Sequence, residues 1–206
     1  MTTADKIRTR TYGIIILAAG SSARMGQPKQ LLEYRGKSLL QHAIDEATKT
    51  GVKNIVVILG NSAGSIKQNV KQNGTVFLEN PEYEEGMASG IRLGVGYLTK
   101  DKENMIEGIL VMLCDQPFVN SELLTKLLER QITTDAPVVA SSYRNKKGVP
   151  ALFHKDVFPE LLALKGDKGA RGIIRKNDRE TITVEFPRGN TDIDTPEDYK
   201  KLVSGH

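Results

Sequence analysis

The residues best suited to chemistry lie in one segment of small and cationic residues near the N-terminus. Residues 17–29 have the sequence LAAGSSARMGQPK, in which a run of small residues is followed by Arg24 and Lys29. Small residues let backbone N–H groups approach a polyphosphate closely, and the two cations can stabilise charge that moves to a leaving group. This composition predicts a phosphate-binding loop.

Three aspartates are candidates for binding a divalent metal ion. Asp115 follows a strongly apolar run, and Asp192 and Asp194 lie just before the last predicted helix. Magnesium prefers oxygen ligands and usually takes one or two carboxylates together with substrate phosphates. We expect Asp115 to be one ligand and Asp194 the second, with Asp192 as the alternative to Asp194. A turn at Asp115 and the helix dipole near Asp192 and Asp194 would explain the same acids without a metal.

The elements that must position these residues follow an alternating pattern. Short apolar runs alternate with amphipathic segments, which is typical of an α/β fold built from βαβ units. Apolar runs without polar alternation indicate strands that are covered on both faces. We predict strands at residues 13–17, 55–59, 76–78, 109–114, 137–140, 150–153 and 181–186.

Apolar residues spaced three and four apart predict the helices between the strands. The last helix has a clear start, because Thr195 can cap it, Pro196 takes the first turn and Asp198 completes a capping box. The other predicted helices lie at residues 38–49, around 91–98, from 121 to about 128, at 156–164 and at 170–176. Since parallel strands end at one edge of the sheet, residues 17–29 and Asp115 should meet there.

Length and composition favour a single domain. A chain of 206 residues can bury a sizeable core, and we expect a flexible N-terminus at residues 1–10 and one domain at residues 11–206. The chain is 39% hydrophobic and 26% charged. Its apolar runs fall well short of the ~20 residues that span a bilayer, so we expect no membrane partner.

Charge, cysteine count and motif spacing argue against several classes of function. The net charge is +4, but the lysines are scattered and only 5% of residues are aromatic, so we expect no nucleic-acid partner. Cys114 is the single cysteine, which rules out an intrachain disulfide and favours a reducing compartment, the cytoplasm. The chain also lacks the dinucleotide-binding spacing G-x-G-x-x-G and the Walker A spacing, which argues against hydride transfer and P-loop hydrolysis.

Residues 17–29 resemble the signature LAAGxSxRMGxxK of the MobA-like NTP transferase family, and the nearest branch is the molybdenum-cofactor (molybdopterin) cytidylyltransferases. The resemblance extends along nearly the whole chain. It includes NP at residues 80–81 with GMASG at 86–90, LCDQP at 113–117, GVP at 148–150, GDKGAR at 166–171 and DIDTPED at 192–198.

This resemblance implies a fold and a reaction. The fold would be a Rossmann-like, three-layer α/β/α sandwich with a mostly parallel sheet, similar to nucleotide-diphospho-sugar transferases. The reaction would transfer a nucleoside monophosphate from an NTP to a phosphorylated acceptor, molybdopterin or the molybdenum cofactor, with release of pyrophosphate. Magnesium, or manganese in its place, would be the cofactor, and a molybdoenzyme would be a further partner.

The resemblance also bears on the base and on the site residues. Ala19 would narrow the room for a purine, which favours CTP over GTP, although the cytidylyl branch commonly has proline where Leu17 stands. Arg24, Lys29 and Asp115 would be catalytic. The nucleotide would contact Leu17, Ala18, Ala19, Gly20, Ser21, Ser22, Arg24, Lys29, Asn80, Gly86, Met87 and Ser89, and the acceptor would contact Gly148, Pro150, Lys168 and Arg171.

Two other functions remain open from the sequence. A nucleotidyltransferase of the same fold that acts on a sugar phosphate or an isoprenoid precursor would keep Arg24, Lys29 and Asp115. A non-catalytic chaperone could bind the nucleotide or the cofactor and pass the cofactor to a partner enzyme. Retention of both cations and the acids argues against the chaperone, because binding alone does not need a complete metal site.

Overall fold

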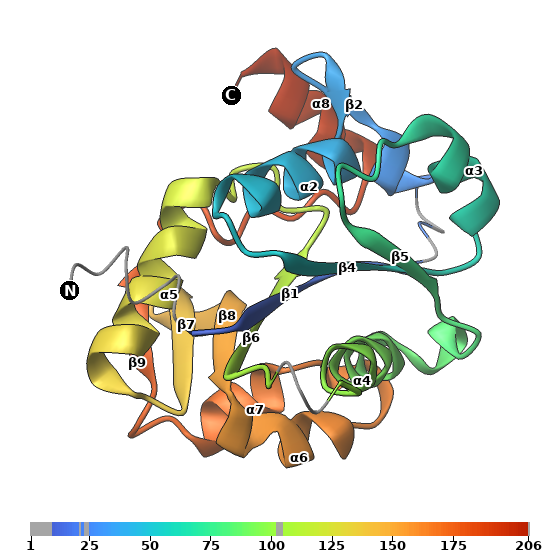
Figure 1. Cartoon of the computed structure of the whole chain (residues 1–206). Helices are drawn as coiled ribbons and strands as arrows, with labels where there is room; N and C mark the ends of the chain where they lie inside the picture. The colour runs from blue at the N-terminus through green and yellow to red at the C-terminus, as the bar shows by residue number, and fades with distance from the viewer. Residues whose placement is uncertain (1–9, 21, 23–24, 102–104, 206) are drawn as a thin grey trace.

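The computed structural model describes residues 10–20, 22, 25–101 and 105–205. Within these ranges a seven-stranded sheet, in the order β5-β4-β1-β6-β8-β7-β9, lies between two layers of helices (Figure 1). This confirms the predicted three-layer α/β fold. Residues 1–9 lie outside the described ranges, so the flexible N-terminus stays a prediction.

The sheet is mostly parallel, as predicted. β5, β4, β1 and β6 run parallel to one another, β9 runs parallel to β7, and β8 is antiparallel to both its neighbours. The reversal arises because β7 and β8 are joined by Arg144 and Asn145, which both have positive φ angles, as a tight hairpin turn requires. The strands are β1 (Tyr12–Ala18), β4 (Asn54–Leu59), β5 (Val76–Glu79), β6 (Gly108–Leu113), β7 (Val138–Tyr143), β8 (Lys146–His154) and β9 (Ile182–Glu185).

Each face of the sheet has its own apolar core. Along β1, Ile14 and Ile16 pack into one core, and Ile15 and Leu17 pack into the other, which explains the apolar run without alternation. The first face is covered by α2 (Leu39–Lys49), α3 (Ala63–Asn69) and α5 (Ser121–Thr134), and the second by α4 (Met87–Leu98), α6 (Phe158–Leu162) and α7 (Arg171–Lys176).

Smaller elements complete the chain. A hairpin of β2 (Glu33–Tyr34) and β3 (Lys37–Ser38) precedes α2, and α8 (Pro196–Ser204) packs its buried Leu202 in a third apolar cluster with Leu39. The 3-10 turns are η1 (Lys29–Leu31), η2 (Tyr83–Glu85), η3 (Lys155–Val157) and η4 (Gly166–Lys168). None of the helices in the described ranges has both the length and the apolarity needed to cross a lipid bilayer.

The strand register brings several chain segments to one edge of the sheet. Leu17 of β1 is paired with Ile58 of β4 and with Leu113 of β6, so these three strands end at the same level. Beyond that level, Gly60 passes so close to Ala19 that a Cβ atom at residue 60 would lie 2.5 Å from the Ala19 carbonyl oxygen. A glycine is therefore required where the chain after β4 crosses the loop after β1.

Three elements differ from the sequence prediction. Helix α4 begins at Met87, so it includes a first turn that precedes the helix predicted around residues 91–98. The helix predicted at 156–164 divides into η3 and the short α6, because Pro159 lacks the backbone N–H that a continuous helix would need. Helix α3 was not predicted, since its seven residues contribute only Ala63 and Ile66 to the core.

The cap of α8 allows a direct test of its predicted start. The Thr195 side chain accepts from the Asp198 N–H at 3.2 Å, and the Asp198 carboxylate accepts from the Thr195 N–H at 2.9 Å. We expect Thr195→Ala to lower the free energy of unfolding by about 1 kcal/mol, measured by urea denaturation. Ser62 is the matched control, because it stands at the N-cap of α3 without a side-chain capping bond. A loss for Ser62→Ala as large as that for Thr195→Ala would contradict this account.

Candidate active site

A cavity of about 770 Å³ lies at the carboxyl edge of the parallel strands, a size typical of small-molecule sites. The loop after β1 lines it together with segments that follow β4, β5 and β6, and residues from the C-terminal third complete the wall. Of the predicted site residues, the cavity is lined by Leu17, Ala18, Ala19, Gly20, Lys29, Gly86, Met87, Asp115, Lys168, Arg171, Asp192 and Asp194.

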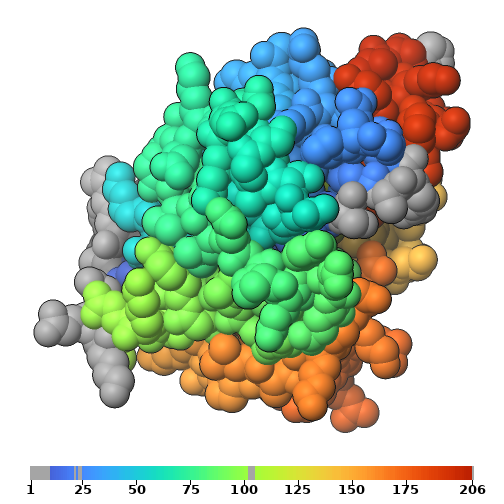
Figure 2. Space-filling view, turned by 90° about the vertical axis from the view of Figure 1, so that its right-hand side faces the viewer, coloured from blue at the N-terminus to red at the C-terminus, as the bar shows by residue number. Residues whose placement is uncertain are grey.

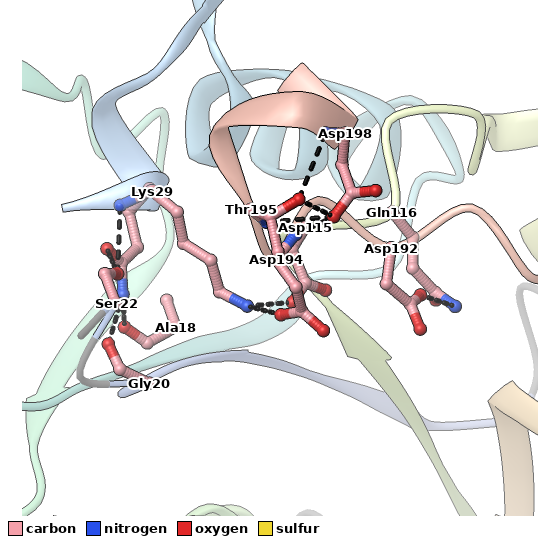
Figure 3. A network of polar contacts seen from close by, with 11 residues as sticks. Ala18, Gly20, Ser22, Lys29, Asp115, Gln116, Asp192, Asp194, Thr195 and Asp198 are labelled. Atoms are coloured by element: carbon pink, nitrogen blue, oxygen red, sulfur yellow. Dashed lines mark hydrogen bonds and ion pairs between the residues drawn. The ribbon is translucent and has the colours of Figure 1, made fainter. Parts of the chain in front are cut away.

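Lys29 lies at the centre of the polar wall of this cavity. Its Nζ contacts a carboxylate oxygen of Asp115 and donates to Asp194 Oδ1 at 2.9 Å (Figure 3). The side chains of Lys29 and Asp115 are only 13% and 11% exposed, whereas that of Asp194 is 42% exposed. One ammonium group therefore joins three segments that lie far apart in the sequence.

The environment of Lys29 keeps its side chain charged. Burial alone would lower the pKa of this amine, but attraction to Asp115 and hydrogen bonds to Asp115 and Asp194 outweigh burial and raise it. The ammonium is therefore protonated throughout the neutral pH range. A permanent cation facing a cavity at this edge is suited to binding phosphate oxygens.

The backbone of Asp115 is held by a hydrogen bond, and one of its carboxylate oxygens is available to bind a donor or a cation. Its carbonyl accepts from the Ile193 N–H at 3.0 Å, which places Asp192 and Asp194 beside it. Within the described part of the chain, its buried Oδ1 has no hydrogen-bond partner. Such an oxygen normally requires a donor or a cation, so these acids fit a divalent metal ion.

The number of acids indicates which kind of metal the site fits. No group of three or more His, Cys, Asp and Glu side chains in the described ranges is arranged to hold a metal. A structural zinc site needs four such protein ligands. Magnesium needs only one or two carboxylates when substrate phosphates and water supply the rest, which is what Asp115 and Asp194 offer.

Asp192 has a different environment from Asp194. Burial, and then the charge of Asp115, raise the pKa of Asp192, and the hydrogen bond from Gln116 Nε2 to its Oδ1, at 3.1 Å, opposes this rise. The same Gln116 amide donates to the Gly189 carbonyl at 3.2 Å. Gln116 therefore fixes Asp192 at the border of the cavity, whereas Asp194 shares Lys29 with Asp115.

Gln30 shapes the loop after β1. It is 1% exposed, and its amide donates to the carbonyls of Ala18 at 2.7 Å and Gly20 at 3.0 Å. Ser22, which has a positive φ, closes the far side of the loop by accepting from the Lys29 N–H at 3.0 Å. The Gln30 bonds thus hold the Ala18 and Gly20 carbonyls toward the protein interior.

Five of the predicted contact residues in the described ranges lie outside the cavity lining, and four of them come from segments other than the loop after β1. Asn80 and Ser89 are buried behind the lining and bond to each other at 2.8 Å, which suits them to shaping the loop between β5 and α4. Gly148 is buried against Tyr143, and the Pro150 carbonyl accepts from Ser141 at 2.7 Å. Among the residues of this GVP segment, Val149 is the one that lines the cavity.

Ser22 does not line the cavity either, because its hydroxyl is engaged in closing the loop. Ser21 and Arg24 lie outside the described residues, so their predicted contacts with the nucleotide stay predictions.

Sequence reasoning did not identify several residues of the site. Gln30 and Gln116 directly follow Lys29 and Asp115, and their adjacency to predicted site residues was the available signal. Asn61, Tyr83 and Glu84 line the cavity from segments that the sequence analysis did not single out. Gly90, Asp167 and Gly169 lie in the GMASG and GDKGAR motifs, but they were not named as contact residues.

Comparisons with known proteins identify the family of this chain. A model of the MobA-like NTP transferase domain matches residues 14–181. A relative from Bacillus cereus (strain G9842), named probable molybdenum cofactor guanylyltransferase, is 30% identical over 194 residues, which cover 90% of this chain and 92% of that protein.

Solved structures show the same fold. The crystal structure of Rv0371c from Mycobacterium tuberculosis H37Rv has a TM-score of 0.80 and 29% identity, and the match covers 95% of this chain and 98% of that one. A structure of Rv0371c in complex with manganese has a TM-score of 0.76 and 26% identity, with 95% and 100% covered. Since the family model spans most of the chain, this protein belongs to the MobA-like NTP transferase family and is a nucleotidyltransferase.

Proposed function

We propose that this nucleotidyltransferase transfers CMP from CTP to a phosphorylated acceptor of the molybdopterin type and releases pyrophosphate. The observation that carries the proposal is the meeting of Lys29, Asp115 and Asp194 in one cavity, beside the small-residue loop that follows β1. An anionic triphosphate and its divalent ion match this combination of a buried cation, two acids and a glycine-containing loop.

The nucleotide side of the cavity has the features that a triphosphate requires. Ala18, Ala19 and Gly20 line it with backbone and small side chains, and Gln30 engages the carbonyls of Ala18 and Gly20. With the carbonyls engaged, the loop can present N–H groups to anionic oxygens. Lys29 then neutralises charge that develops on the departing pyrophosphate, and we assign the same role to Arg24.

The acids would hold the metal ion, which we take to be magnesium. Asp115 Oδ1 would be the principal ligand, with Asp194 as the second and Asp192 as the alternative to it. When bound, the ion would supply charge neutralisation at the phosphate oxygens. Manganese is the alternative metal, because the similar protein Rv0371c has been crystallised with manganese.

The acceptor side is assigned to cationic residues of the C-terminal third that line the cavity. Lys168 and Arg171 line the wall beside Asp167, and two cations suit an acceptor that carries a phosphate. A phosphate oxygen is already ionised, so its attack on the α-phosphorus needs no strong general base. Rate enhancement in this scheme comes from positioning and from neutralising charge.

The molybdopterin assignment rests on the motif resemblance along the chain and on the name of the Bacillus cereus relative. That relative is named as a guanylyltransferase, so GTP is the competing nucleotide. We favour CTP because Ala19 lines the cavity and its methyl group narrows the space for a larger base. A molybdoenzyme would receive the product, and we place the reaction in the cytoplasm.

Loss of either charged centre should abolish most of the activity. We expect Lys29→Ala and Asp115→Ala each to lower turnover by about 100- to 1000-fold, because each removes one preorganised charged group. Pyrophosphate release is the measurement, and thermal unfolding shows whether each variant is folded. Lys37→Ala is the matched control, since Lys37 pairs with Asp45 on the surface and is 53% exposed. Near-normal turnover in a folded Lys29 or Asp115 variant would contradict the mechanism.

The preference for CTP over GTP can be tested by removing the methyl group of Ala19. We expect wild-type protein with magnesium to bind CTP more tightly than GTP or ATP, and Ala19→Gly to shift the ratio toward GTP by about tenfold. Equilibrium calorimetry gives both affinities. Ala140→Gly is the matched control, because Ala140 is a buried alanine of β7 that does not line the cavity. A clear wild-type preference for GTP would overturn the CTP assignment and leave nucleotidyl transfer intact.

A further inference from the structure

A second charged cluster joins two segments of the cavity wall. Arg92, on α4, donates to both carboxylate oxygens of Glu85, at 2.7 and 2.5 Å, and to Glu82 at 3.0 Å. It also donates to the Leu164 carbonyl at 2.8 Å. Its guanidinium therefore spans from the loop before α4 to the segment after α6.

Glu85 adds a second bond between the same two segments. Its Oε1 accepts from the Gly166 N–H at 3.1 Å. Hydrogen bonds from Arg92, and then from the Gly166 N–H, lower the pKa of Glu85 to about 2, so the pair is ionised at neutral pH. The Arg92–Glu85 ion pair therefore binds two backbone groups of one short segment, the Leu164 carbonyl and the Gly166 N–H.

The two segments are in close contact beyond this pair. Figure 2 shows the green chain around residues 80–100 resting against the orange chain around residues 155–175. Gly86 has a φ of 112°, and a Cβ atom there would lie 1.9 Å from Asp167 Oδ1. The backbone at Gly86 therefore packs directly against Asp167.

The two segments depend on Arg92 to different degrees. The Ser89 hydroxyl lies 2.8 Å from the Glu82 carbonyl and 2.9 Å from the Gly86 carbonyl, which anchors the loop before α4 without Arg92. Among the described residues, two hydrogen bonds join the start of the segment at residues 164–171 to the loop before α4 and to α4. Arg92 donates to the Leu164 carbonyl, and the Gly166 N–H donates to Glu85. Loss of the guanidinium should therefore release this segment and leave the loop in place.

We propose that Arg92 is a positioning residue that, through Glu85, fixes residues 164–171 and so sets the position of Lys168 and Arg171. The assignment of Lys168 and Arg171 to the acceptor rests on the proposed function. Arg92 itself lies outside the cavity lining. Its contribution is geometric, since a displacement of about 1 Å in a binding group can cost two orders of magnitude in rate.

The test separates acceptor binding from nucleotide binding. We expect Arg92→Ala to raise the KM for the acceptor by about tenfold or more, while kcat and the KM for the NTP change by less than about threefold. Arg92→Lys should restore part of the loss, because an ammonium can bond to Glu85 or to Leu164 but lacks the planar fork that binds both carboxylate oxygens. Arg130→Ala is the matched control, because Arg130 is an exposed residue of α5, which covers the opposite face of the sheet.

A second readout does not depend on the acceptor. In the free protein, hydrogen exchange of the amides at residues 164–171 should be faster in Arg92→Ala than in wild type, while the amides of α4 exchange at the wild-type rate. Unchanged exchange in this segment overturns the inference, and so does an equal rise in both KM values. If Arg92→Ala does not fold, Glu85→Gln takes its place in both assays with the same criteria.

The two proposals fail in different ways. If wild-type protein releases no pyrophosphate with any acceptor, the proposed function is wrong, and hydrogen exchange still decides whether Arg92 fixes residues 164–171. If wild-type protein is active and Arg92→Ala has an unchanged acceptor KM, the positioning role of Arg92 is wrong and the proposed function stands.

Discussion

The ion contact between Lys29 and Asp115 is the constraint on which the site depends. A buried ammonium and a buried carboxylate each lose hydration on folding, and only close pairing with further hydrogen bonds compensates for this loss. Lys29 achieves this pairing with Asp115 and Asp194, which are 86 and 165 positions further along the chain. The loop after β1, the end of β6 and the start of α8 are consequently held at one point, where the cavity lies.

Two buried glutamines support this arrangement from opposite sides. Gln30 engages the carbonyls of the loop after β1, and Gln116 bonds to Asp192. Both follow a charged residue of the site directly in the sequence, so each charged side chain points into the cavity while its neighbour points into the protein. Asp115 Oδ1, which has no hydrogen-bond partner among the described residues, belongs to a carboxylate whose other oxygen already contacts the Lys29 ammonium.

Much of the fold could be predicted from the sequence, and the reason is physical. Strands buried on both faces have continuous apolar runs, and α2 and α8 carry capping residues and apolar stripes that mark their ends. The strand predicted at residues 150–153 is part of β8, but its antiparallel direction and the short α3 were not predicted, because hairpin geometry and a two-residue apolar contact leave weak periodicity. Lys29 and Asp115 could be predicted because they lie in motifs that resemble the family's. Contacts between distant segments, such as those of Arg92, leave no pattern in the local sequence and could not be predicted.

A triphosphate and its metal ion should bind at the carboxyl edge of the sheet. A crystal structure with magnesium and a non-hydrolysable CTP analogue would show whether they do. We expect phosphate density along residues 17–29, with Lys29 at the phosphates and a metal ion about 2.1 Å from an Asp115 oxygen, the usual magnesium distance. Nucleotide density elsewhere on the molecule, or a metal ion bound away from Asp115, would contradict it.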